Sequence, residues 1–321
     1  MGATMSKNTC ADDFSHYSVM ASECIDGLNI DPCGTYCDLT LGGGGHSGLI
    51  AERLTSGRLI CVDTDITAIK AAGKRLERFS DRITYVNDNF RNIDAILQSA
   101  GVDEIDGALI DLGVSSFQLD CAERGFSYMQ DAPLDMRMNT SDPVSAYNIV
   151  NELSEEELKK IIYTYGEENF ASSIARRIVK ERQNAPIQTT LQLVDVIKSA
   201  MPAKAKVGGH HPAKRTFQAI RIAVNSELEI IEPTLRAIVS RLSKNGRLCV
   251  ITFHSLEDRI VKQTFASLSS GCTCPANFPV CVCGKTPKVK AVNKKPILPS
   301  DEELQENPRS RSAKLRIAEK L

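Results

Sequence analysis

The sequence predicts an α/β fold with a mainly parallel sheet, interrupted by an inserted helical domain. Short apolar runs alternate with helix-period segments over residues 35–112, which is the pattern of consecutive βαβ units. Residues 121–212 then show helix signals without a strand, and strand-type sequence returns after them. We therefore expect a discontinuous domain of residues 1–120 and 213–321, with residues 121–212 as the insertion.

Four strands are expected before the insertion, because each is a short apolar run bounded by Gly, Asp or Asn. The segments between them place apolar residues at helical spacing, as Ile66, Ile69 and Leu76 show. The expected strands are residues 35–41, 58–63, 82–87 and 106–112, and the expected helices are residues 46–54, 66–79 and 93–100.

Helix-capping patterns recur in the insertion. Ser154 with Glu157 forms a capping box, and Thr189 gives a second cap signal. The remaining expected elements are a long helix over residues 215–242, a strand over 246–253, a helix over 256–268 capped by Ser255, and a last strand over 313–318.

Composition excludes several classes of protein. The 321 residues carry 39 basic and 40 acidic side chains, and this balance argues against a polycationic nucleic-acid binder. The apolar runs are far shorter than the roughly 20 residues of a membrane span, and the first thirty residues lack a secretory pattern. The chain has eleven cysteines, an odd number, and seven of them are scattered without a spacing rule, which does not suggest a disulfide framework. We expect a cytoplasmic protein without membrane partners.

A glycine-rich turn, DLTLGGGGHSG at residues 38–48, follows an expected strand and opens a helix. Such a turn points backbone amides at a ligand, although it can also simply close a tight connection. Asp63 and Asp111 end the second and fourth strands, so both should face one crevice. Clustered carboxylates suit the sulfonium and ammonium of S-adenosylmethionine better than the pyrophosphate of NAD. No Gly-Lys-Ser/Thr follows, which excludes a P-loop.

Several longer strings carry a family resemblance. Together with GGGGHSG, they closely resemble the bacterial 16S ribosomal RNA cytosine-N4 methyltransferases, the RsmH or MraW family, from about His16 to Glu319. The strings are DLGVSSFQLD at 111–120, ERGFSYMQDAPLDMRM at 123–138, TFQAIRIAVNSEL at 216–228, ITFHSLEDRIVK at 251–262 and ENPRSRSAKLRIAE at 306–319.

The resemblance implies a Rossmann-like S-adenosylmethionine-dependent methyltransferase with an inserted helical domain. Its reaction would be methylation of N4 of cytosine 1402 in 16S ribosomal RNA, near the decoding site of the small ribosomal subunit. The cofactor contacts that it implies are Gly44, Gly45, His46, Asp63, Phe90, Asp111 and Gln118.

Three residues are candidates for the chemistry. The N4 amine is a poor nucleophile, so transfer needs alignment and an acceptor for its proton. Asp111 is the candidate acceptor, and it could instead hold the methionine ammonium of the cofactor. His254 and Glu257 follow the fifth strand, where they could seat the target base. The alternative for His254 is a helix-start residue that bonds backbone.

Local charge suggests where RNA would bind. Residues 285–321 hold ten Lys or Arg against five Asp or Glu. Phosphate groups could pair with either of two basic regions, although such charges can also be plain solvated surface. The second region comprises Lys204, Lys206, His210, His211, Lys214, Arg215 and Arg221.

Four cysteines form a cluster of their own. Cys272, Cys274, Cys281 and Cys283 have the spacing C-x-C-x6-C-x-C. Four thiolates could hold one structural zinc, although C-x2-C is the commoner spacing. The alternative is a loop of reduced thiols.

Two other functions stay open. Amino-methylating DNA enzymes carry an Asn/Asp-Pro-Pro-aromatic signature, whereas residues 111–114 read Asp-Leu-Gly-Val. A non-enzymatic RNA-binding protein on the same scaffold should have lost its cofactor residues, which are intact here. The sequence does not decide the oligomeric state and leaves a homodimer open.

Overall fold

The computed structural model describes residues 18–202, 211–271, 274, 280 and 283–321. In this part of the chain one seven-stranded sheet has the order β3-β2-β1-β4-β5-β7-β6. The first five strands are parallel, whereas β7 is antiparallel to both neighbours. The strands are β1 (Thr35–Asp38), β2 (Arg58–Asp63), β3 (Ile83–Asn87), β4 (Ile105–Asp111), β5 (Leu242–Thr252), β6 (Val289–Ala291) and β7 (Lys314–Lys320).

Helices cover both faces of the sheet, because apolar residues alternate between the faces along each strand. Ile60 and Val62 of β2 face one apolar core, and Leu59 and Cys61 face the other. This arrangement confirms the predicted α/β class. The first core includes α4 (Ile93–Ser99), α12 (Ile231–Arg241) and α13 (Ser255–Ser269), and the second includes α1 (Ala21–Leu28), α2 (Gly45–Arg53) and α3 (Ile66–Arg75).

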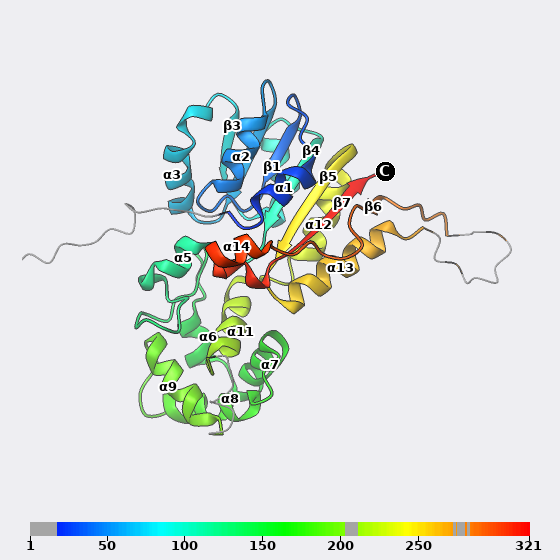
Figure 1. The fold of residues 1–321 in the computed structure, drawn as a ribbon. Coiled ribbons are helices and arrows are strands. Elements are labelled where there is room, and N and C mark those ends of the chain that lie inside the picture. Colours follow the sequence, from blue (N-terminus) through cyan, green and yellow to red (C-terminus); the bar gives the residue numbers. More distant parts are fainter. Residues whose placement is uncertain (1–17, 203–210, 272–273, 275–279, 281–282) are drawn as a thin grey trace, which may run out of the picture.

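A helical layer lies beyond the end of the sheet to which β5 points (Figure 1). Its apolar core is separate from the two cores of the sheet, and Phe217 and Ile220 of α11 contribute to it. Both predicted cap signals open helices of this layer, at Ser154 and Thr189. The division of the chain into domains stays a prediction. The helices are α6 (Ala146–Glu152), α7 (Glu155–Gly166), α8 (Ala171–Arg182), α9 (Thr190–Ala200) and α11 (Lys214–Asn225).

Two expectations about the second half of the chain are wrong. The expected helix over residues 215–242 is two helices, because Ser226 adopts a left-handed φ of 51° and ends α11. Pro233 then lies in the first turn of α12, where its missing N–H costs no helical hydrogen bond. The cap of α13 is His254 rather than Ser255, which is the first helical residue.

Three short elements complete the described fold, and none of them was predicted. Helix α5 (Ser116–Asp120) follows β4, and α14 (Asp301–Glu306) precedes β7. Strand β6 pairs only with β7, at the edge of the sheet. Within the described residues, no helix is both long enough and apolar enough to cross a membrane.

Candidate active site

A cavity of about 320 Å³ opens at the carboxyl ends of the five parallel strands. The segments that follow these strands line one side, and α11 lines the other. Strand order reverses between β1 and β4, and ligands of open α/β sheets bind at such a point. We name two parts of the cavity by their residues. The glycine-loop end comprises Gly42, Gly45, His46, Asp63 and Asp111, and the arginine end comprises Arg221, Glu227, His254 and Glu257.

Asp63 is tied to the turn after β1. Its carboxylate accepts backbone hydrogen bonds from Gly42 and Asp65, both of 2.8 Å. Burial raises the pKa of Asp63 to about 6, although these two hydrogen bonds oppose the shift. The carboxylate is therefore fixed in place at the mouth of the glycine turn, with lone pairs left for a ligand hydroxyl.

The glycines of the turn differ in backbone conformation and in whether they line the cavity. Gly42 and Gly44 have left-handed φ values of 49° and 74°, which glycine adopts without strain. A Cβ on Gly44 would lie 3.1 Å from a methyl of Leu76, so this residue fits against α3. Gly45 lines the cavity, whereas Gly44 does not. Of the predicted cofactor residues, Gly44 is the one that the structure leaves out of the cavity wall.

His46 lies buried at the start of α2. Its Nε2 donates to the carbonyl oxygen of Val19 over 2.9 Å, which leaves Nδ1 as an acceptor in the neutral ring. Burial lowers the pKa of His46, although the nearby Asp38 opposes that shift. His46 is therefore neutral at pH 7, and it anchors the segment before α1 against the cavity wall.

Asp111 is the least satisfied carboxylate of the site. Its backbone N–H donates to Thr40 Oγ1 over 2.6 Å, but its side-chain Oδ1 is buried and has no hydrogen-bond partner among the described residues. Burial raises the pKa of Asp111 well above its ordinary value, and the charges of Asp38 and Glu257 raise it further. A buried oxygen without a partner fits a cationic group, as S-adenosylmethionine would bring. The residues present therefore fit this cofactor.

Gln118 and Phe90 lie on the same wall. Gln118 Oε1 accepts from the backbone N–H of Ser115 over 3.2 Å, and Nε2 lies 3.4 Å from Asp65 Oδ2. Asp65 is itself bound by Arg124 at 2.6 Å. Phe90 is partly buried against the first core and offers an apolar surface to the cavity.

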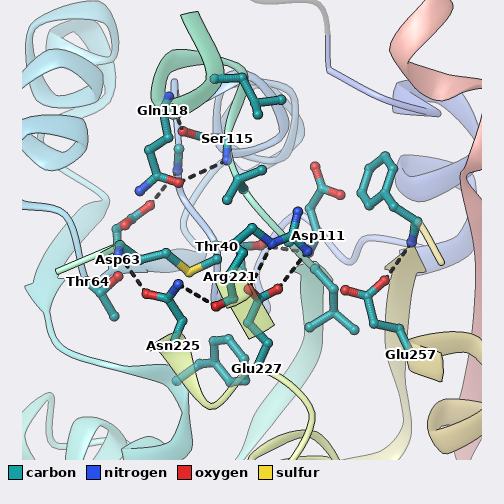
Figure 2. A pocket seen from close by; sticks show the side chains of 18 of the residues that line it. Thr40, Asp63, Thr64, Asp111, Ser115, Gln118, Arg221, Asn225, Glu227 and Glu257 are labelled. Carbon is teal, nitrogen blue, oxygen red and sulfur yellow. Dashed lines mark hydrogen bonds and ion pairs between the residues drawn. The ribbon is translucent and has the colours of Figure 1, made fainter. Parts of the chain in front are cut away.

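Arg221 forms the centre of the arginine end. Its Nε and Nη2 donate to the two carboxylate oxygens of Glu227 over 2.9 and 2.8 Å, and both side chains are mostly buried. Figure 2 shows Arg221 and Asp111 between Asp63 on one side of the pocket and Glu257 on the other. The basic region predicted around Lys214 therefore loses Arg221, whose charge is used inside the protein, and its Lys204, Lys206 and His210 lie outside the described residues.

Glu257 and His254 complete this end. Backbone N–H groups of Phe253 and His254 donate to Glu257 Oε2, over 2.8 and 3.2 Å. His254 Nδ1 accepts from the Glu257 backbone, and its Nε2 lies 3.2 Å from Glu257 Oε1 without hydrogen-bond geometry. Burial alone would raise the pKa of Glu257, but His254 and Arg221 outweigh it and hold that pKa below its ordinary value. Glu257 is therefore an ionised carboxylate at neutral pH.

Glu227, His254 and Glu257 also have the composition of a metal site. One ligand atom from each lies within 4.8 Å of the others. However, the guanidinium of Arg221 already occupies both oxygens of Glu227. Because Arg221 supplies the positive charge that these carboxylates need, we assign no metal here.

The predicted zinc cluster lies mostly beyond the described residues. Cys272 and Cys281 are outside them, whereas Cys274 is half-buried and Cys283 exposed. A zinc ion at these four thiols therefore stays a prediction. Metal analysis of protein purified without chelator tests it, and less than about a tenth of an equivalent would end the idea.

Several polar residues of the cavity were not predicted, and four of them contact other residues of the site. Thr40 and Ser115 bond the backbone or side chain of predicted residues, Asn225 ends α11, and Glu227 follows that helix. Asn225 lies one helical turn after Arg221, so helical spacing alone places the two on one face. The sequence offered no comparable signal for Thr40 or Ser115.

Comparisons with known proteins agree with this geometry. The model of the MraW methylase family matches residues 13–321. A ribosomal RNA small subunit methyltransferase H from Clostridium botulinum is 57% identical over 310 residues, which cover 96% of this chain and 100% of the relative. Proteins of the same name from Clostridioides difficile and Brevibacillus brevis are each 56% identical, over 96% of this chain and 100% and 98% of the relatives. The chain therefore belongs to the MraW methylase family.

Proposed function

We propose that this protein methylates N4 of cytosine 1402 in the 16S ribosomal RNA of the small subunit, with S-adenosylmethionine as methyl donor. Relatives named ribosomal RNA small subunit methyltransferase H, more than half identical over their whole length, support the substrate. The specific nucleotide and atom come from the family resemblance of the sequence. The proposal includes a cytoplasmic location, since ribosomal subunits are assembled there.

One observation about the geometry carries the proposal. A single cavity joins the glycine-loop end, where Asp63 and Asp111 have no ion-pair partner among the described residues, to an arginine end where Arg221 pairs with Glu227. The first suits a cationic cofactor, and the second suits a neutral, polar base. Two ligands that must react can therefore meet in one enclosed space, as methyl transfer requires.

The residues that line the cavity have separate proposed roles in cofactor binding and in proton transfer. The bound cofactor supplies an electrophilic methyl group on a sulfonium. Asp63 accepts from ribose hydroxyls, and Gly45, His46, Phe90 and Gln118 line the space around the nucleoside. Asp111 faces the cationic part of the cofactor and is the proposed acceptor of the amine proton, for which a raised pKa is suitable.

His254 and Glu257 are proposed to seat the base. Glu257 is ionised and fixed by two backbone N–H groups, so its other oxygen can accept from an amine. Cytosine presents such an amine at N4, whereas uracil presents an acceptor oxygen that a carboxylate would repel. This end therefore favours cytosine.

Transfer of a labelled methyl group to small subunits that lack the modification tests the proposal. We expect N4-methylcytidine after nuclease digestion, at one site in 16S RNA. Subunits that already carry the modification are the matched control and should accept no label. Absence of N4-methylcytidine from the unmodified subunits would overturn the proposed function.

A further inference from the structure

A second cavity, of about 450 Å³, adjoins the arginine end. The two cavities share Lys214, Gln218 and His254 as lining residues, so one continuous ligand could extend from the first into the second. Its volume lies in the range of small-molecule and nucleotide sites. The function proposed above does not use this space.

Two exposed cations line the second cavity. Lys214 and Arg215 are exposed and form no ion pair with any described residue. Arg215 Nη1 donates only to the backbone carbonyl of Glu167, over 3.2 Å. The cavity also lies where α8, α11 and α13 begin, and the starts of helices favour anions.

Two acids line the same cavity, but both are engaged. Glu167 accepts from Ser255 Oγ over 2.8 Å and pairs with Arg259 at 3.3 Å. Glu168 is buried and accepts from the backbone N–H of Phe170 over 2.9 Å. The charge of Arg215 helps to lower the pKa of Glu167, but neither Lys214 nor Arg215 lies within ion-pair distance of a carboxylate among the described residues, so both can contact a ligand.

An aromatic surface lies beside these cations. The ring of His211 lines the cavity and is stacked on Tyr128, with 4.7 Å between centroids and 13° between planes. Burial and the charge of Lys198 lower the pKa of His211, so the ring is neutral at pH 7. Proteins bind single-stranded nucleic acid by stacking its bases on aromatic rings and pairing its phosphates with cations, and this cavity offers both kinds of group.

We propose that the second cavity binds the nucleotide next to the target cytosine, with Arg215 and Lys214 on its phosphate and His211 beside its base. This inference rests on the proposed function, since the target base must leave its stack to enter the first cavity. Its neighbour then loses a stacking partner. The shared wall brings that neighbour directly to the second cavity.

Substitution of Arg215 tests the inference, because this residue lines the second cavity and not the first. The probe is a fluorescent single-stranded RNA of roughly ten nucleotides that contains the target cytosine. For Arg215→Ala we expect about tenfold weaker binding and a salt dependence of log Kd that is shallower by about 0.7. The Kd for the cofactor should stay within about twofold of wild type, because Arg215 does not line the first cavity.

Two further variants make the result decisive. Arg176→Ala removes the same charge from an exposed position on α8 that lines neither cavity. Arg215→Lys keeps the charge and should recover most of the binding. The inference is overturned if Arg215→Ala binds RNA like Arg176→Ala, or if Arg215→Lys binds as weakly as Arg215→Ala. Failure of the proposed function looks different, because wild-type protein would then bind this RNA without forming N4-methylcytidine.

Discussion

The carboxylates at the two ends of the candidate active-site cavity lie in different electrostatic surroundings. At the glycine-loop end, Asp63 and Asp111 have no cationic partner among the described residues, and burial raises the pKa of both. At the arginine end, Arg221 binds Glu227, and Arg221 with His254 holds the pKa of Glu257 down. One end lacks positive charge, and the other already contains it.

This difference supports the ligand that the proposed function gives to each end. Unpaired buried carboxylates cost folding free energy, and a cationic ligand offsets that cost when it binds. The arginine end already contains a cation, and under the proposed function it offers directed hydrogen bonds to a neutral base. The cavity is therefore asymmetric before any ligand arrives.

The largest expected effect comes from Asp111→Asn at the glycine-loop end. We expect about 100-fold weaker cofactor binding, because the cofactor would lose a buried charge partner. Turnover should also fall, since the proposed proton acceptor is gone. The cofactor-free protein should melt about 2 °C higher, because a costly buried charge has been removed. Calorimetric titration with the cofactor and thermal melting measure these changes.

Asp38→Asn is the matched control for this variant. Asp38 is also buried, but Ser47 Oγ donates to it over 2.6 Å and it does not line the cavity. Its effect on turnover should be milder. Wild-type turnover and cofactor affinity in Asp111→Asn would contradict the proposed role of the glycine-loop end.

Arg221→Gln would remove the cation from the arginine end, so that its carboxylates would lack a positive partner like those of the glycine-loop end. It leaves Glu227 and Glu257 without their shared cation, and breaking a buried pair from one side costs about 3 kcal/mol. The pKa of Glu257 should rise, so turnover should acquire a new loss at low pH. Urea denaturation and the pH profile of turnover measure the two effects.

Replacing both Arg221 and Glu227 with apolar residues distinguishes the effect of an unpaired charge on stability from the effect of lost packing. The double variant Arg221→Met with Glu227→Leu removes the pair that Arg221→Gln leaves half intact, and should recover much of the lost stability. Wild-type stability of Arg221→Gln would show that the pair is not the neutralising element we take it to be.

Arg221 shows that a count of charged residues in the sequence does not predict which of them face RNA. The resemblance and the alternation of strands and helices predicted the parallel sheet, and its order brings Asp63, Asp111, His254 and Glu257 to one cavity. Counting charges placed Arg221 on an RNA-facing surface, because a count cannot see that Glu227 binds it six residues later.

Other misses have equally local causes. The break after α11 depends on the left-handed backbone of Ser226, a conformation that residue type does not predict for serine. Thr40 was missed because its partner is the backbone of Asp111, 71 residues away. Periodicity reports which face of an element is apolar, but it does not report which side chain completes a distant hydrogen bond.

A smaller effect is expected from Arg124→Lys, which tests whether the two ends are independent. Arg124 binds Asp65 beside the glycine-loop end and donates to the carbonyl of Met138 over 2.8 Å. The N–H of Met138 donates to Asn225 of α11 over 2.7 Å. Lysine can keep the ion pair but not the carbonyl contacts, so we expect a loss of about 2 kcal/mol in stability.

The same variant should weaken cofactor binding by about threefold, although Arg124 does not line the cavity. Combining it with Arg221→Gln gives a double-mutant cycle. A coupling energy of about 1 kcal/mol would show that the two ends are coupled, as the contacts of Met138 with Arg124 and Asn225 suggest. Additive stability losses would instead mean that the ends fold and bind independently.

The smallest expected effect is a pH dependence that only the glycine-loop end should show. Since burial raises the pKa of Asp63 to about 6, the carboxylate gains a proton as pH falls through that value. Cofactor affinity should therefore fall on acidification, by less than about tenfold per pH unit for each proton.

The stability of the cofactor-free protein should change in the opposite direction. A raised pKa stabilises the fold at low pH, and this contribution is lost as pH rises through about 6. Titrations in two buffers of different ionisation heat should show proton release on binding, and Asp63→Asn should flatten both dependences. The pKa of Glu257 is lowered, so Glu257 keeps its charge as pH falls through about 6. Proton uptake on cofactor binding, in place of proton release, would contradict the role proposed for Asp63.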